Sequence, residues 1–176
     1  MIVTLLGYMG SGKSTVGIKL AAQKNWQFID LDDYIVDQEQ LSISELFEKR
    51  GHIEFRKLEV KAVQNICRTH SNIILALGGG TPCYGNTMTF LNQHPDVFTI
   101  YLRASVQNLA NRLILEKSKR PLIANINNND LAEFIAKHLF ERSKFYNQAQ
   151  WNISVDQLSI NRVIEKIQNE LNEYNF

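Results

Sequence analysis

The sequence contains little cysteine, little proline and no excess of charge of either sign. Its two cysteines, Cys67 and Cys83, form no CxxC spacing and no paired-ligand pattern with the four histidines. A disulfide framework and a zinc site are therefore not expected. The 19 basic and 18 acidic side chains leave a formal net charge of +1. This balance gives no indication of a nucleic-acid or membrane surface as a partner.

Long hydrophobic runs are absent too, since no apolar stretch is long enough to span a bilayer. The N-terminus runs from Ile2–Leu6 into a glycine loop, without the basic start and longer apolar core of a signal peptide. We therefore expect a cytoplasmic protein. The 176 residues suit one domain that buries its own core, and no repeat or linker divides them.

Short apolar runs alternate with segments of helical periodicity. A helical pattern is clear near the C-terminus, where apolar residues recur from Ile160 to Leu171. The alternation predicts an α/β fold in which helices cover a parallel sheet on both faces. The five runs that we expect to be strands are residues 2–6, 28–31, 73–77, 97–102 and 151–155.

A phosphate-binding motif follows the first expected strand. Residues 7–14 read GYMGSGKS, which matches G-x-x-x-x-G-K-[ST] in full, and a helical run follows it. Backbone N–H groups of such a loop surround phosphate oxygens, the lysine contacts the β- and γ-phosphates, and the serine hydroxyl binds Mg²⁺. The motif is shared by switch proteins, motors and kinases. The residues that we expect to bind ATP here are Gly10, Ser11, Gly12, Lys13, Ser14 and Thr15.

Three acidic residues, Asp30, Asp32 and Asp33, lie at the carboxyl end of the second expected strand. The carboxyl ends of parallel strands share one edge of a sheet, so these carboxylates should lie near the γ-phosphate. Asp30 could hold Mg²⁺ through water, and Asp32 could orient an acceptor hydroxyl and take its proton. Alternatively, the segment is a helix N-cap followed by an acidic first turn, and one aspartate could serve both purposes.

Two arginines occupy helix positions that align with apolar residues. Helical spacing places Arg56 on the face of Val60 and Val63, and it aligns Arg142 with the stripe that ends at Tyr146. Two guanidinium groups could bind one carboxylate, because each can bind that planar group bidentately. Alternatively, each stem lies along the core surface or the charge pairs internally, as Arg56 could with Glu59.

Three consecutive glycines, Gly78, Gly79 and Gly80, end the third expected strand. Without side chains they would let a ligand lie against the backbone, although a plain turn is the alternative. Further along, residues 117–130 form a polar segment that contains Arg120 and separates two helical patterns. It is predicted to be a mobile flap that brings Arg120 to the γ-phosphate, while Arg112 supports the nucleotide. Alternatively, both arginines are solvated surface charges.

Taken together, these motifs resemble the shikimate kinase family of nucleoside-monophosphate-kinase-like P-loop proteins, over almost the whole chain. The segments that carry the resemblance are GYMGSGKST from residue 7, DLD at 30–32, G-x-x-x-FR ending at 56, LGGG at 77–80, RPL at 120–122 and ER-x-x-x-Y from 141. Two positions depart from the family pattern: His52 replaces a common acidic residue, and residues 157–159, directly after the Val155–Asp156 pair, lack a common arginine.

The resemblance implies a three-layer α/β/α sandwich of P-loop kinase type with strand order 2-3-1-4-5. It implies transfer of the γ-phosphate of ATP to the 3-hydroxyl of shikimate, with Mg²⁺, by a monomer. Asp32 would contact the acceptor, Arg56 and Arg142 would hold its carboxylate, and Gly78 to Gly80 would line its pocket. In addition, Phe47 and Phe55 would flank its ring, Asp30 would act near Mg²⁺ through water, and Arg120 would be the lid arginine.

The resulting expectation is one kinase domain over residues 1–176, with acceptor-binding helices at about 32–62 and a mobile lid at about 113–128. Another small-molecule kinase of the same fold, such as a gluconate or nucleotide kinase, is the enzymatic alternative. A nucleotide-dependent switch is the alternative from another class, and it would consume ATP slowly whatever small acid is added.

Overall fold

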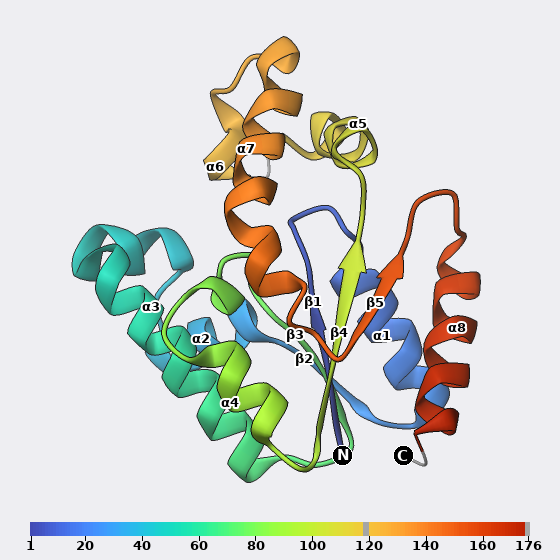
Figure 1. The fold of residues 1–176 in the computed structure, drawn as a ribbon. Coiled ribbons are helices and arrows are strands. Elements are labelled where there is room, and N and C mark those ends of the chain that lie inside the picture. The colour runs from blue at the N-terminus through green and yellow to red at the C-terminus, as the bar shows by residue number, and fades with distance from the viewer. Residues whose placement is uncertain (118–119, 175–176) are drawn as a thin grey trace.

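The computed structural model describes residues 1–117 and 120–174. Its core is a parallel sheet of five strands in the order β2-β3-β1-β4-β5 (Figure 1), which confirms the predicted fold class. Every residue of the central strand β1 is buried, which explains why the predicted strands are continuous apolar runs. The strands are β1 (Ile2–Leu6), β2 (Gln27–Asp30), β3 (Ile73–Ala76), β4 (Val97–Arg103) and β5 (Trp151–Ser154).

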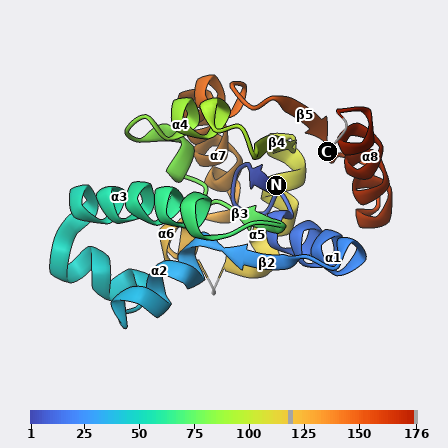
Figure 2. The ribbon, with the colours of Figure 1, turned by 90° about the horizontal axis from the view of Figure 1, so that it is seen from below.

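Helices cover both faces of the sheet and complete the three layers. Figures 1 and 2 show α1 and α8 on one face and α3 and α4 on the other, while α5 and α7 stand above the carboxyl ends of the strands. In the described part of the chain, no helix is long and apolar enough to cross a membrane. The helices are α1 (Lys13–Lys24), α2 (Leu31–Glu39), α3 (Ile43–Thr69), the 3₁₀ helix η1 (Thr81–Cys83), α4 (Thr87–Gln93), α5 (Val106–Glu116), α6 (Pro121–Ala124), α7 (Asn128–Tyr146) and α8 (Ile160–Glu173).

Local sequence signals determine where α3 begins and bends. Its start is a capping box, in which the Ser42 hydroxyl accepts from the Glu45 N–H at 3.3 Å and the Glu45 carboxylate accepts from the Ser42 N–H at 2.9 Å. Inside the helix, Gly51 has φ 75°, a left-handed conformation that interrupts the regular hydrogen bonding. The kink separates the short segment carrying Phe47 from the long segment carrying Arg56.

The segment predicted as a flap is more ordered than a plain loop. It contains the one-turn helix α6, and α7 begins inside it at Asn128. The side chain of Ile123 is fully buried, so this region has an apolar anchor of its own. Ser118 and Lys119, which belong to the predicted flap, lie outside the described residues. The lid boundaries of about 113–128 remain a prediction.

Candidate active site

The loop between β1 and α1 has the conformation that the phosphate-binding motif predicts. Gly10 and Gly12 have φ values of 79° and 95°, which are left-handed conformations that favour glycine. The carbonyl of Gly12 accepts the first bond of α1 from Val16 N–H at 2.9 Å. The loop therefore ends at a helix N-terminus, whose free N–H groups and positive dipole favour anions.

Lys13 points back over the loop. Its Nζ donates to the carbonyl oxygens of Gly7 at 2.8 Å and Tyr8 at 3.1 Å. Burial lowers the pKa of Lys13 to about 8, although the nearby Asp30 and Asp32 carboxylates act in the opposite direction. A desolvated cation at this position gains strongly from an added anion, since the anion replaces lost hydration.

Asp30 connects the phosphate-binding loop to α2. One of its carboxylate oxygens accepts from the Ser14 hydroxyl at 3.0 Å, and the other accepts from the Asp32 N–H at 3.1 Å. The N-cap alternative for this aspartate is confirmed, because Asp30 caps α2. It also lies beside Ser14, and its role near a metal stays a prediction.

Asp32 lies in the first turn of α2 and faces the glycine turn. Burial raises its pKa to about 6, helped by the negative charges of Asp30 and Glu59 and opposed by Lys13. A Cβ atom added to Gly78 would lie 3.1 Å from a carboxylate oxygen of Asp32. A carboxylate whose pKa approaches neutrality inside a cleft is a candidate proton acceptor.

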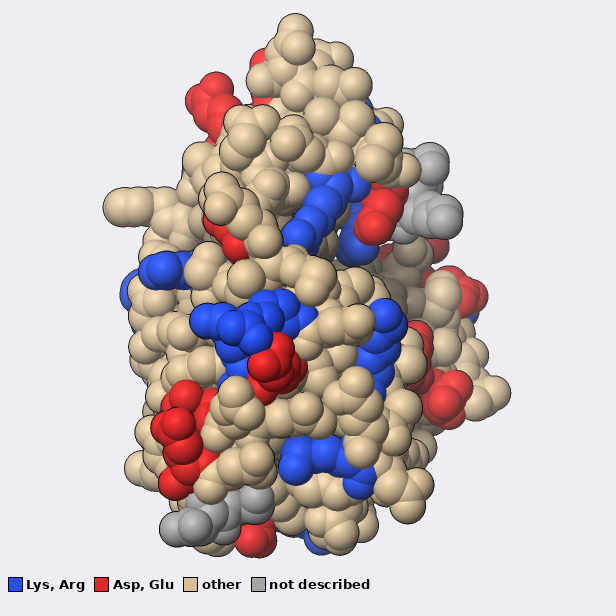
Figure 3. Space-filling view, turned by 90° about the vertical axis from the view of Figure 1, so that its right-hand side faces the viewer, with Lys and Arg blue, Asp and Glu red and all other residues tan. Residues whose placement is uncertain are grey.

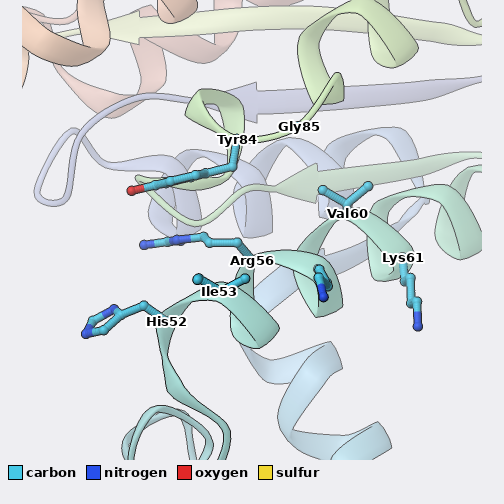
Figure 4. A pocket seen from close by; sticks show the side chains of 8 residues that line it. His52, Ile53, Arg56, Val60, Lys61, Tyr84 and Gly85 are labelled. Carbon is cyan, nitrogen blue, oxygen red and sulfur yellow. The ribbon is translucent and has the colours of Figure 1, made fainter.

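Arg56 forms an ion pair inside the protein with Glu59, which is the internal pairing that the sequence offered as an alternative. Its Nη1 donates to Glu59 at 2.6 Å, and the other Glu59 oxygen accepts from the Thr81 hydroxyl at 2.5 Å. The guanidinium carbon lies 4.5 Å from the centre of the Tyr84 ring, and Figure 4 shows the side chain extended beside that ring. These contacts hold Arg56 in one orientation.

Arg142 reaches the same glycine turn from α7. Its Nη1 donates to the Gly79 carbonyl at 3.4 Å, and Tyr146 donates to that carbonyl as well. A Cβ atom at Gly80 would lie 2.8 Å from Nη1 of Arg56, and one at Gly79 would lie 3.7 Å from Nη1 of Arg142. The two guanidinium groups thus lie beside consecutive glycines of one turn.

The face assigned to Arg56 from helical spacing is only partly right. The side chain of Arg56 is 21% exposed and that of Glu59 is 2% exposed. Glu59 is therefore the charged residue that α3 buries, and Arg56 lies at the edge of that face. From the sequence, Glu59 is predicted only as a possible internal partner of Arg56. Its position three residues after that arginine is the signal that could have placed it in the site.

The phosphate-binding loop, the aspartates and part of the glycine turn line one cavity of about 480 Å³. Arg112 and Arg120 also line it; Arg112 donates to the Gly10 carbonyl at 3.0 Å, whereas Arg120 is paired with Glu116 at 2.6 Å. On the face in Figure 3, lysine and arginine side chains lie around the hollow beneath the upper helices. The other lining residues include the predicted Ser11, Gly12, Ser14, Thr15, Gly78 and Gly79 and the apolar Val155, Leu158, Ile160 and Val163.

Three predicted acceptor residues lie just outside this cavity. Of the described residues, Arg56, Gly80 and Arg142 do not line it, and Arg56 instead borders a neighbouring hollow of about 510 Å³ (Figure 4). The apolar lining comes from the loop after β5, with Val155 and Leu158, and from the start of α8, and it offers a surface on which a nucleobase could pack. Residues 157–159 supply no arginine there. A phosphate loop, adjacent carboxylates and a second cationic region on this fold define a P-loop kinase.

Comparison with known proteins identifies the family. A model of the family described as shikimate kinase matches residues 9–172. The chain belongs to the shikimate kinase family. It is 47% identical over 165 residues to a shikimate kinase of Flavobacterium johnsoniae, covering 94% of this chain and 95% of that protein. A second relative, the shikimate kinase of Flavobacterium psychrophilum, is 42% identical over 165 residues with the same coverage.

Solved structures of the family have the same fold. The shikimate kinase of Bacteroides thetaiotaomicron superposes with a TM-score of 0.90 at 33% identity, covering 98% of both chains. The Acinetobacter baumannii enzyme, solved in complex with shikimate, gives a TM-score of 0.86 at 27% identity, covering 98% of this chain and 93% of that one. The expected family and fold are confirmed, and the roles of individual residues remain to be tested.

Proposed function

We propose that the cavity beside Lys13 carries out in-line transfer of the γ-phosphate of ATP to the 3-hydroxyl of shikimate. Membership of the shikimate kinase family makes the chain an ATP-dependent kinase that acts on shikimate. The observation that carries the assignment of the site is the meeting of Lys13, Asp30 and Asp32 in one cavity, one glycine turn away from two arginines. This arrangement offers one binding region for the phosphates and a second, beside the two arginines, for a carboxylate.

On the nucleotide side, the phosphates would lie in the loop and against the N-terminus of α1. The buried Ser11 hydroxyl has no hydrogen-bond partner among the described residues, and a phosphate oxygen would supply one. Lys13 would leave the loop carbonyls to neutralise the β- and γ-phosphates. Arg112 would support the nucleotide, and Arg120 would exchange Glu116 for the γ-phosphate when the lid closes.

Mg²⁺ fits the donor set around Ser14. In the described part of the chain, no group of three or more His, Cys, Asp or Glu side chains forms a metal cage. Mg²⁺ commonly binds through one or two protein oxygens together with water and substrate phosphates, so a cage is not required. Ser14 and Asp30, which are 3.0 Å apart, would hold the ion directly and through water, and the bound ion would neutralise charge on the phosphates.

On the acceptor side, Asp32 would align the 3-hydroxyl and accept its proton. Arg56 and Arg142 would bind the carboxylate, with Gly78, Gly79 and Gly80 lining the pocket and Phe47 and Phe55 packing on the ring. The rings of Phe47 and Phe55 are 4.4 Å apart, so they already form one apolar surface. In this assignment residues from about 32 to 62, in α2 and α3, bind the acceptor. Residues from about 113 to 128, from the end of α5 to the start of α7, form the lid.

The first experiment measures ADP release from MgATP with and without shikimate, with quinate, gluconate and nucleoside monophosphates as alternative acceptors. We expect strong stimulation by shikimate alone, and loss of it when EDTA removes Mg²⁺. Stimulation by another acceptor would overturn the acceptor assignment while keeping the phosphate site, and slow release that no acid changes would indicate a switch. We also propose that the enzyme is monomeric and cytoplasmic, as the family resemblance and balanced charge suggest.

Replacing Arg56 with lysine is expected to raise the KM for shikimate by about tenfold or more, because lysine cannot reproduce a bidentate guanidinium contact. The KM for ATP should stay within about twofold, since Arg56 does not line the nucleotide cavity. Lys57→Arg, on the exposed face of the same helix turn, is the matched control. An unchanged KM for shikimate in Arg56→Lys would contradict the carboxylate assignment.

A further inference from the structure

The phosphate-binding loop is joined to α7 by a hydrogen bond between Tyr8 and His138. The Tyr8 hydroxyl lies 3.0 Å from Nδ1 of His138, and the two rings meet edge to face with centres 6.1 Å apart. Tyr8 is 1% exposed, so its hydroxyl needs a partner inside the protein. The histidine ring also contacts Phe134, whose ring centre is 4.2 Å from its own.

Arg142 lies over the ring that this hydrogen bond fixes. The guanidinium carbon of Arg142 is 5.4 Å from the centre of the Tyr8 ring, within the range of a cation–π contact. Arg142 is one helical turn beyond His138, so both side chains leave α7 on the same side. The loop that holds the nucleotide therefore also supports an arginine of the acceptor side.

Arg142 has weaker anchors than Arg56. Arg56 donates to the buried Glu59 at 2.6 Å, whereas the hydrogen bond from Arg142 to the Gly79 carbonyl is 3.4 Å long. A 3.4 Å contact orients a guanidinium poorly. The Tyr8 ring is thus a further support of Arg142, and His138 holds the hydroxyl end of that ring.

The charges around His138 favour its neutral form. Burial lowers the pKa of His138, and Arg142 and Lys137 act in the same direction, while Glu141 opposes them. Burial also raises the pKa of Tyr8 to about 12. Tyr8 and His138 are therefore both neutral near pH 7. When the imidazole proton is on Nε2, Nδ1 is an acceptor and the Tyr8 hydroxyl donates to it.

We propose that Tyr8 and His138 are positioning residues that orient Arg142 toward the carboxylate of the acceptor. This inference rests on the proposed role of Arg142 as a carboxylate ligand. The side chains of both residues act through Arg142, so their loss changes acceptor binding rather than the phosphoryl-transfer step. Tyr8 contributes to nucleotide binding only through its backbone, which a change of side chain leaves in place.

The test compares steady-state kinetics of Tyr8→Phe, His138→Phe and the double variant, all of which keep an aromatic ring at each position but remove the hydrogen bond. Each single variant should raise the KM for shikimate by about 3- to 10-fold, which is the range expected for loss of one hydrogen bond. The kcat and the KM for ATP should change by less than about twofold. Because both residues act through one bond, the double variant should be no worse than His138→Phe alone.

Two further variants separate positioning from a general loss of structure. His138→Gln retains a group that can bond to the Tyr8 hydroxyl and should bring the KM for shikimate back toward the wild-type value. His94→Phe, in a His–Phe pair at the C-terminal end of α4, should have no effect. A fall in kcat together with similar rises in the KM for ATP and the KM for shikimate would overturn the inference. Additive effects of the two substitutions in the double variant would overturn it too. Arg142→Lys tests the underlying role: if it leaves the KM for shikimate unchanged, the proposed carboxylate ligand is wrong, whatever Tyr8 and His138 do.

Discussion

Replacing Lys13 with methionine is expected to lower kcat/KM for ATP by about 10²- to 10³-fold or more, the scale seen when one preorganised electrostatic donor is removed. Methionine keeps a similar length and apolar stem but loses the charge. Among the described residues of the free protein, the ammonium donates to the carbonyls of Gly7 and Tyr8, and burial lowers its pKa to about 8. The buried charge therefore destabilises the folded protein, and bound phosphates would stabilise it.

The measurement is ADP release at saturating shikimate over a range of MgATP concentrations. Lys19→Met is the matched control, because Lys19 lies on the same helix with an exposed side chain. A near-wild-type kcat/KM in Lys13→Met would contradict the placement of the γ-phosphate in this loop.

The lowered pKa of Lys13 predicts a pH dependence of the wild-type enzyme. Since Lys13 loses its proton near pH 8 in the free enzyme, kcat/KM for ATP should fall as the pH rises through that value.

The nucleotide side of the site could be predicted from the sequence because its geometry is local. Eight consecutive residues carry the phosphate motif, and the same short segment supplies the strand, the loop and the helix N-terminus. Asp30 was also predictable, since it ends a strand whose carboxyl end must lie at the same sheet edge. Here chain order alone determines which atoms meet.

The acceptor side depends on contacts between distant segments, so periodicity predicted it less well. A helical pattern places Arg56 and Glu59 on neighbouring faces, but only packing against Thr81 decides that Glu59 is the buried one. Likewise, nothing in the spacing of Tyr8 and His138 indicates a hydrogen bond across 130 positions. The lid shows the same limit, because the buried Ile123 gives α6 an anchor that a polar, asparagine-rich segment does not suggest.

The second large effect is expected for Asp32→Asn, which should lower kcat by about 10²- to 10⁴-fold, the usual contribution of a positioned acid or base. Asparagine keeps the shape of the side chain but cannot accept the proton of the acceptor hydroxyl. In the wild type, kcat/KM for shikimate should rise with pH through about 6, where Asp32 ionises. The variant should lack this rise, which a pH profile of ADP release would show. A retained rise would assign the ionisation to another group.

The same substitution is expected to make the protein more stable at neutral pH. The pKa of Asp32 is raised from 3.8 to about 6 on folding, so the folded state binds the proton more tightly between these values and stability falls as pH rises through them. Above pH 6 the full cost remains, about 3 kcal/mol at 1.36 kcal/mol per pKa unit. Asparagine removes the charge, which should raise Tm by about 6 to 12 °C at pH 7.5.

Thermal unfolding of both proteins at pH 7.5 and pH 4 separates this cause from a general packing effect. The gain in Tm should be large at pH 7.5 and nearly absent at pH 4, where the folded wild type already carries a protonated Asp32. Asp33→Asn, the neighbouring and more exposed carboxylate, is the control and should gain less at either pH. A variant that is inactive and more stable would mean that the protein keeps a destabilising charge at this position because the phosphoryl transfer requires it. A variant that loses stability at pH 7.5 would instead make Asp32 a structural residue of α2.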